Sequence, residues 1–291
     1  MDALRKSLIR GIEDAMPRMS KGQKAIAAFI LTNYDQAAYL TAASIGETVG
    51  VSESTVVRFA MELGYEGFPH FQKALKEELK VRLTAAQRLY ASGRLAGSDD
   101  ILGTVLLADA DRLRRAAEQT DRERFRKAVD ILQHAKRVFI VGVRSSAPLA
   151  SFLAYYFNYI FSDVRLLNPT GASDMLEQIM TAGHGDVVVG ISFPRYSKRT
   201  IDAMNYSRKA GASVVVVTDK DDTPVARAAD CVLLAPSDMM SFVDSLTAPM
   251  SVITALVVAL GLQQKEQVGE TLEKLERLWD EYDVYDKGGA P

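Results

Sequence analysis

The sequence is poor in the residue types that build disulfides and metal centres. Its 291 residues include one cysteine and three scattered histidines. The lone Cys231 cannot close an internal disulfide, and no cluster of cysteine and histidine has the spacing of a zinc site. We therefore predict a protein without structural disulfides, without a metal centre and without a cofactor.

Neither sign of charge is in excess. The 35 Lys and Arg residues and the 37 Asp and Glu residues leave a formal net charge of −2. Residues 1–83 hold 11 basic and 10 acidic side chains, so this part is as balanced as the rest. A chain of this kind does not coat nucleic acid through bulk charge. Any nucleic-acid partner must be recognised by a few specifically positioned side chains.

Long apolar runs are also missing. The N-terminus lacks the uninterrupted apolar stretch of a secretory signal. The most apolar late segment, residues 248–261, is too short to span a bilayer, which takes about 20 residues, and is typical of a buried core helix. We expect a cytoplasmic protein with no membrane partner.

Length and composition predict two folded domains. The 291 residues exceed one domain of ordinary size, and 48% hydrophobic with 25% charged residues is the composition of a folded protein. The apolar pattern is helical over residues 1–83, weak over 84–100, and alternates between strand and helix further on. We predict an all-α domain at 1–83, a linker at 84–100 and an α/β domain at 101–285 with its core at 120–261.

The first domain contains the outline of a helix-turn-helix. Ser44 and Glu47 fit a capping box for one helix. Gly50 then interrupts the pattern, Ser52 offers the N-cap of a second helix, and Gly64 ends it. A helix, a short glycine-containing turn and another helix form a common DNA-binding motif, whose second helix enters the major groove.

The second helix of this motif has one apolar face, formed by Val56, Phe59, Ala60 and Leu63. Hydroxyls on its remaining surface can bond phosphates, and an arginine there can reach a guanine edge. The alternative is a small bundle of two capped helices with a solvated arginine. The predicted DNA-contacting residues are Ser52, Ser54, Thr55 and Arg58.

The second domain alternates short apolar runs with helical stretches. The runs occur at residues 137–141, 164–167, 186–191, 213–217 and 231–234. Continuous apolar strands separated by helices are typical of a parallel sheet covered on both faces. We predict a three-layer α/β domain with about five parallel strands, in the flavodoxin-like order 2-1-3-4-5.

Two strand-to-helix junctions of this domain collect polar side chains. They follow the first and third strands, which flank the switch point where such sheets bind ligands. Hydroxyls and unpaired amides at helix N-termini attract an anion, and an arginine can fork onto it. The alternative is that these residues only make turns and caps. The predicted ligand-binding residues are Gly142, Arg144, Ser145, Ser146, Ser192, Arg195 and Ser197.

Part of the first domain resembles a known family. The run Ser52-Glu53-Ser54-Thr55-Val56-Val57-Arg58-Phe59, followed by Gly64-Tyr65-Glu66-Gly67-Phe68, resembles the N-terminal domain of RpiR-type bacterial transcriptional regulators. The resemblance implies a winged-helix-like or helix-turn-helix reader of a double-stranded DNA operator. It also implies self-association into a dimer or tetramer, and it gives recognition-helix roles to the four DNA-contacting residues named above.

The second domain resembles the SIS (sugar isomerase) fold, which RpiR-type regulators carry as a ligand sensor. The similarity spans residues 120–261 and includes Gly142 and Ser146. It implies binding of a phosphorylated sugar or a related acid by hydroxyls of the two loops. Arg144 replaces the second glycine of the family pattern G-x-G-x-S, and Pro194-Arg195 replaces Ser-Gly in S-x-S-G-x-T. We expect an anionic ligand whose pose differs from the family's.

An enzyme of the same fold is the alternative, because aldose–ketose isomerisation needs only a well-placed general base. His184 stands between two glycines and fits a turn, while nothing around Glu177 or Asp244 marks a tuned acid or base. Cys231 lies in an apolar run and fits the core. We therefore predict no catalytic residue. The favoured function is a non-enzymatic, DNA-binding regulator whose operator affinity responds to a phosphorylated sugar or sugar acid, with a sugar-phosphate isomerase as the alternative.

Overall fold

The computed structural model describes residues 8–82, 84–90, 99–168, 174–238 and 240–285. The chain clusters into two units, and the first boundary between them falls between Asp99 and Asp100. Within the predicted linker, residues 85–90 form a short helix, and residues 91–98 lie outside the described part.

The first unit consists of helices packed around one apolar core. Val56, Phe59 and Ala60 are fully buried in that core, which confirms the predicted inner face of the second helix of the motif. No strand occurs in residues 8–82 or 84–90, so the helical form of the predicted DNA-binding domain is the one observed. The elements are α1 (Leu8–Ala15), η1 (Met16–Arg18), α2 (Lys21–Thr32), α3 (Tyr34–Ala37), α4 (Ala42–Val49), α5 (Glu53–Glu62), α6 (Phe68–Arg82) and α7 (Ala85–Tyr90).

The turn between α4 and α5 depends on two glycines. Gly50 follows α4 with a φ of 74°, a conformation that glycine adopts without strain. A Cβ on Gly46 would lie 2.7 Å from the carbonyl oxygen of Val51, so only glycine allows this close approach. The start of α4 differs from the prediction. Its N-cap is Thr41, whose hydroxyl accepts a hydrogen bond from the amide of Ser44 at 3.1 Å.

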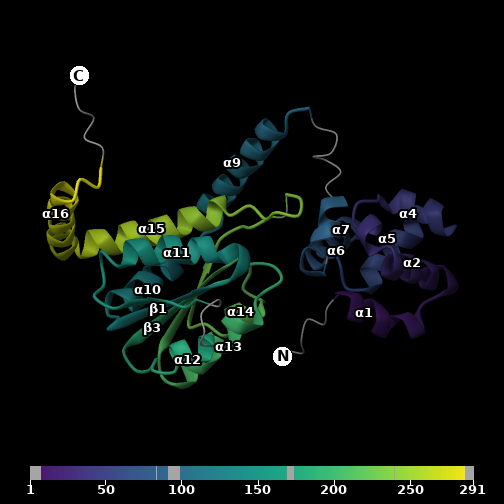
Figure 1. The fold of residues 1–291 in the computed structure, drawn as a ribbon. Coiled ribbons are helices and arrows are strands. Elements are labelled where there is room, and N and C mark those ends of the chain that lie inside the picture. Colours follow the sequence, from purple (N-terminus) through teal and green to yellow (C-terminus); the bar gives the residue numbers. More distant parts are fainter. Residues whose placement is uncertain (1–7, 83, 91–98, 169–173, 239, 286–291) are drawn as a thin grey trace. The chain divides into compact units, whose positions relative to one another are not determined.

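The second unit is a five-stranded sheet in the order β2-β1-β3-β4-β5, and every neighbouring pair is parallel (Figure 1). This confirms the predicted fold class and strand order. The elements are α9 (Ile101–Gln119), α10 (Arg122–Gln133), β1 (Arg137–Gly142), η2 (Arg144–Ser146), α11 (Ala147–Phe157), β2 (Val164–Leu166), α12 (Met175–Ile179), β3 (Asp186–Ile191), α13 (Lys198–Lys209), β4 (Ser213–Thr218), α14 (Pro224–Arg227), β5 (Cys231–Leu234), α15 (Thr247–Gln263) and α16 (Lys265–Glu281).

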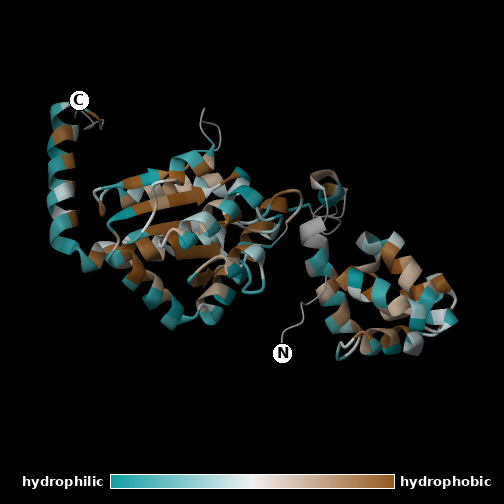
Figure 2. Cartoon of the chain, turned by 90° about the horizontal axis from the view of Figure 1, so that it is seen from below, coloured by the Kyte–Doolittle hydropathy of each residue, from teal (hydrophilic) through white to brown (hydrophobic). Residues whose placement is uncertain are grey.

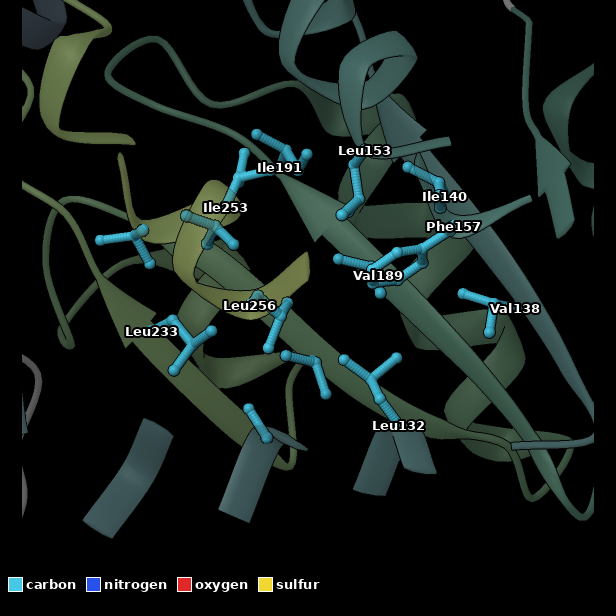
Figure 3. Packing of buried hydrophobic residues seen from close by; sticks show 14 of the residues in the cluster. Leu132, Val138, Ile140, Leu153, Phe157, Val189, Ile191, Leu233, Ile253 and Leu256 are labelled. Carbon is cyan, nitrogen blue, oxygen red and sulfur yellow. The ribbon is translucent and has the colours of Figure 1, made fainter. Parts of the chain in front are cut away.

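Two helix layers cover the two faces of the sheet. Val138 and Ile140 of β1 belong to the core shared with α10, α11 and α15, part of which Figure 3 shows. Phe139 and Val141 belong to the core shared with α12, α13 and α14. The strands are therefore apolar on both sides, and they form a hydrophobic band in Figure 2.

The helix α15 is the apolar segment predicted at residues 248–261, and it buries Val252, Ile253 and Leu256 against the sheet. In the described part of the chain, no single helix is both long and apolar enough to cross a membrane. Length and composition reach that level only for α15 and α16 taken together, and these two helices meet at a bend of 101°.

An ion pair between a half-buried arginine and a buried carboxylate joins the first residues of β1 and β3. The Nε and Nη2 groups of Arg137 donate to the two carboxylate oxygens of Asp186 at 2.9 and 2.7 Å. The amide of Gly183 donates to the same carboxylate at 2.9 Å. Burial by itself raises the pKa of Asp186, but the hydrogen bonds from Arg137 and Gly183 outweigh it and hold that pKa below its ordinary value.

Candidate functional sites

The start of α5 gathers three of the predicted DNA-contacting residues. Ser52 is the N-cap of α5, and its hydroxyl lies 2.9 Å from the hydroxyl of Ser54 and 2.8 Å from that of Thr55. The Ser52 side chain does not cap a backbone amide. A hydroxyl cluster at the positive end of a helix suits a phosphate group.

Arg58 lies further along α5 and is exposed. Its guanidinium group makes no hydrogen bond and no ion pair with the described residues. Because Val56 and Phe59 are fully buried, α5 is fixed to the core while this guanidinium stays available to a base edge or a phosphate. The four predicted residues therefore lie on one helix, three of them at its start.

The N-terminus of α2 adjoins the same region, which the sequence analysis missed. A Cβ on Gly22 would lie 3.2 Å from the Cγ1 atom of Val51 and 3.8 Å from the Cγ2 atom of Thr55. Its neighbour Lys21 is exposed. Sequence spacing alone gave no signal for this residue, because it is 31 positions before Ser52 and comes close only through helix packing.

A pocket of about 120 Å³ lies between the loops that follow β1 and β3. It sits at the switch point of the sheet, because β2 and β3 flank β1 on opposite sides. Ligand pockets usually measure about 300–1,000 Å³, so this one fits the charged end of a ligand better than a whole one. The lining residues are Val143, Arg144, Ser145, Ser146, Ser192, Phe193, Pro194, Arg195, Ser197 and Asp244.

Six of the seven predicted ligand-binding residues line this pocket, and Gly142 does not. A Cβ on Gly142 would lie 2.8 Å from the carbonyl oxygen of Ser146 and 3.0 Å from the Cβ atom of Ala150. The loop and the start of α11 can fold back against the end of β1 only because no side chain stands there. Gly142 therefore positions the loop rather than lining the pocket.

The serines of the pocket differ in what they already bind. The Ser192 hydroxyl accepts from the amide of Ser197, and the Ser197 hydroxyl accepts from the amide of Thr200 to cap α13, both at 3.3 Å. Ser145 is exposed and has no hydrogen bond among the described residues. Ser192 and Ser197 therefore hold the loop in place, while the hydroxyl of Ser145 is open to a ligand.

Both arginines of the pocket have a left-handed backbone. Arg144 has a φ of 56° and Arg195 a φ of 69°, and in the described chain only Asp283 joins them among non-glycine residues. This conformation costs a residue other than glycine roughly 1–2 kcal/mol. The resemblance to the SIS fold described from the sequence implies glycine at both positions. The loops thus keep a glycine-type backbone and add two guanidinium groups.

The segment that carries Asp244 is bonded to α9. The Nη2 group of Arg115 donates to a carboxylate oxygen of Asp238 at 2.7 Å. On the other side of Asp244, the Ser245 hydroxyl donates to Asp109 at 2.6 Å. One wall of the pocket is therefore held by the first helix of the second unit.

Of the acid and base candidates considered from the sequence, Asp244 is the one that lines the pocket. His184 lies in an exposed turn, as predicted, and the Glu177 carboxylate accepts from the amide of Asp174. Cys231 is buried in β5, as predicted, and burial raises the pKa of its thiol. Such a thiol is a poor nucleophile.

Comparison with known proteins gives matches to both units. A model described as the helix-turn-helix domain of the rpiR family matches residues 6–82, and a model described as the SIS domain matches residues 131–259. The transcriptional regulator HexR of Escherichia coli is 25% identical, over 92% of this chain and 93% of its own length.

Two solved structures share the fold. The sugar isomerase domain of an RpiR transcription factor from Sphaerobacter thermophilus is 25% identical, with a TM-score of 0.58 over 62% of this chain and 99% of that one. The Vibrio vulnificus NanR protein, complexed with ManNAc-6P, is 23% identical, with a TM-score of 0.57 over 93% of this chain and 98% of that one.

Proposed function

We propose that this chain, which belongs to the RpiR-type regulators, senses a phosphorylated sugar or sugar acid with its SIS domain and so modulates operator binding. A helix-turn-helix domain of the rpiR family precedes that SIS domain. The observation that carries the proposal is the pocket at the switch point, lined by hydroxyls and two arginines. The relative from Vibrio vulnificus, which is complexed with a phosphosugar, supports the ligand class. The protein then works in the cytoplasm, where its operator is.

Operator recognition is assigned to α5. Ser52, Ser54 and Thr55 contact the DNA backbone at the helix start, Arg58 contacts a base edge or phosphate, and Lys21 adds a phosphate contact from α2. One such helix reads only a half-site, so two copies of the chain bind one operator as a dimer or as half of a tetramer.

Coupling between the two domains starts at the wall that carries Asp244. A ligand that draws the two loops together also acts on this wall of the pocket. The wall is hydrogen-bonded to Asp109 and Arg115, which are residues of α9. Because α9 is the first helix after the predicted linker, a change in its position reaches the DNA-binding domain. The ligand changes the operator affinity only to the extent that it binds more tightly to one arrangement of the DNA-binding and SIS domains than to another.

The experiment measures operator affinity with and without ligand. An operator is first selected from genomic DNA by the full-length protein, and a panel of phosphorylated sugars and sugar acids is screened by thermal shift. Each compound that binds is expected to change the operator Kd by about 5- to 150-fold, the usual range of allosteric coupling. Dephosphorylated sugars are the control. Bound ligands that leave the Kd unchanged contradict the coupling, and a panel without binders contradicts the sensor.

A sugar-phosphate isomerase is the second candidate, favoured only by the carboxylate of Asp244 in the pocket lining. An isomerase exchanges the proton on C2 of an aldose phosphate, since a base must remove it. We take Asp244 as a wall residue and the protein as no enzyme. Deuterium uptake at C2 from heavy water, followed by NMR, would establish the isomerase instead.

Ser145→Ala is expected to weaken binding of a phosphorylated ligand by about 3- to 10-fold, the worth of one hydrogen bond, at an unchanged melting temperature. Ser197→Ala removes the cap of α13 as well and is expected to lower the melting temperature too. Calorimetric titration and thermal melting of both variants separate the two roles. If Ser145→Ala leaves the affinity unchanged, the hydroxyl of Ser145 has no part in ligand binding.

A further inference from the structure

The pocket is lined by two guanidinium groups on separate loops. Arg144 and Arg195 come from separate loops, and each is exposed without an ion pair among the described residues. The one carboxylate in the lining is Asp244. Two guanidinium groups that share a pocket of about 120 Å³ repel each other, and a single carboxylate does not balance them.

Neither arginine is explained by the fold. Both have a left-handed backbone, which an arginine adopts only at a cost, and glycine would hold the same loop path without strain. Neither side chain packs in a core, since both are exposed. A strained residue that contributes nothing to packing points to a role in ligand binding.

The remaining polar groups already suffice for a phosphate. The Ser145 hydroxyl, which is open, can donate a hydrogen bond to a phosphate oxygen. In the first turn of α13 the amides of Lys198 and Arg199 can do the same, since those of Ser197 and Thr200 already donate to serine hydroxyls, and the helix dipole favours the charge. These groups can therefore bind one dianionic phosphate without the use of both guanidinium groups. A second anionic group on the same ligand would use the guanidinium that remains, and guanidinium pairs with a carboxylate in a two-point contact.

We propose that the ligand carries two anionic groups, a phosphate and a carboxylate, and that Arg144 and Arg195 select this class over phosphorylated sugars and polyols with a single anionic group. This rests on the proposed function, since it concerns the same pocket. It narrows the ligand to phosphorylated sugar acids.

Matched pairs of compounds test the proposal. Glycerol 3-phosphate and 3-phosphoglycerate differ only in a hydroxymethyl against a carboxylate group, as do ribitol 5-phosphate and 5-phosphoribonate, and sorbitol 6-phosphate and 6-phosphogluconate. Titration calorimetry on the full-length protein is expected to give, in the pair of best-fitting length, about 10- to 100-fold tighter binding of the acid, the range for a hydrogen-bonded charge pair.

Glycine variants assign the effect to the arginines. Arg144→Gly and Arg195→Gly keep the left-handed backbone and are expected to fold normally, with the preference for the acid reduced to less than about threefold in at least one of them. Lys209→Ala removes an exposed cation from the far end of α13 and is expected to keep the full preference.

Each of the other experimental outcomes contradicts either the two-anion proposal or the proposed sensor function. Equal affinities within a pair for the wild type contradict the two-anion proposal while leaving the sensor standing. Arginine variants that lose both compounds equally show that the two guanidinium groups share one phosphate, which also contradicts it. If no compound of any length binds, the proposed sensor function itself fails.

Discussion

Replacing Arg58 by alanine is expected to weaken operator binding by about 10- to 100-fold, because a placed arginine contact is worth about 1–3 kcal/mol. Arg58 is exposed on α5 and has no partner among the described residues, so its removal leaves no unpaired charge behind. Fluorescence anisotropy with a labelled operator gives the Kd at fixed salt concentration. Ligand binding, measured by calorimetry, is expected to stay unchanged.

The matched control is Arg277→Ala, which removes the same charge from an exposed position on α16. This variant is expected to bind the operator like the wild type. Equal loss of affinity in both variants would assign the effect to net charge and contradict the role of α5. A loss of ligand binding together with operator binding in Arg58→Ala would point to misfolding.

Replacing Arg137 by alanine is expected to lower the free energy of unfolding of the SIS domain by about 2–4 kcal/mol. The carboxylate of Asp186 is 3% exposed and would be left without its main partner, and breaking a buried pair usually costs about 3–5 kcal/mol. The expected value is somewhat smaller because the Arg137 side chain is 29% exposed. Urea unfolding followed by circular dichroism measures it.

The control for this variant is Arg165→Ala. Arg165 makes the same two-point contact with Asp163, but the two side chains are 45% and 36% exposed, so its loss is expected to cost at most about 1 kcal/mol. If both variants lose the same stability, the burial of Asp186 is not what makes its ion pair matter.

The effect of Arg137→Ala is expected to shrink in acid. In the wild type the pKa of Asp186 is depressed, so its contribution is complete above the unfolded-state pKa near 3.9 and is lost as the pH falls through the folded-state value. In the variant, burial without the guanidinium raises that pKa, and the carboxyl group becomes neutral at a higher pH. The stability difference is therefore expected to be largest at pH 7 and smaller at pH 4.5. A difference that does not change with pH would contradict this account.

The second unit could be predicted well because its physical signal is local. A strand buried on both faces needs an unbroken apolar run, and β1, β3 and β4 each supply one. The rules for parallel sheets with helical crossovers then leave a few common strand orders, and the predicted flavodoxin-like order 2-1-3-4-5 is the one observed. The placement of both polar loops at the switch point follows from the order.

Helix starts were harder to predict, as α4 illustrates. Thr41 and Ser44 are both good N-caps three residues apart, and their hydroxyls lie 2.8 Å from each other. The earlier start brings Ala42 into the core, where it is 6% exposed. Packing decides between two caps of similar strength, and packing cannot be seen in the local sequence.

The pocket shows the same limit. Asp244 reaches the lining because Asp238 and Ser245 on either side of it are bonded to α9, more than 120 residues earlier in the chain. The left-handed conformation of Arg144 and Arg195 could not be predicted either, since arginine avoids it and only the surrounding loop enforces it.

Those two left-handed arginines also affect how such a domain can evolve. Every arginine codon is a single base change from a glycine codon, and glycine fits a φ of 56° or 69° better than arginine does. A mutation that deletes one guanidinium from the pocket would therefore stabilise the protein, whereas most changes of specificity cost stability. Lineages can lose or regain a pocket charge in one mutational step without rebuilding the scaffold. Close relatives that differ at these two positions are then expected to respond to different metabolites while keeping the same fold.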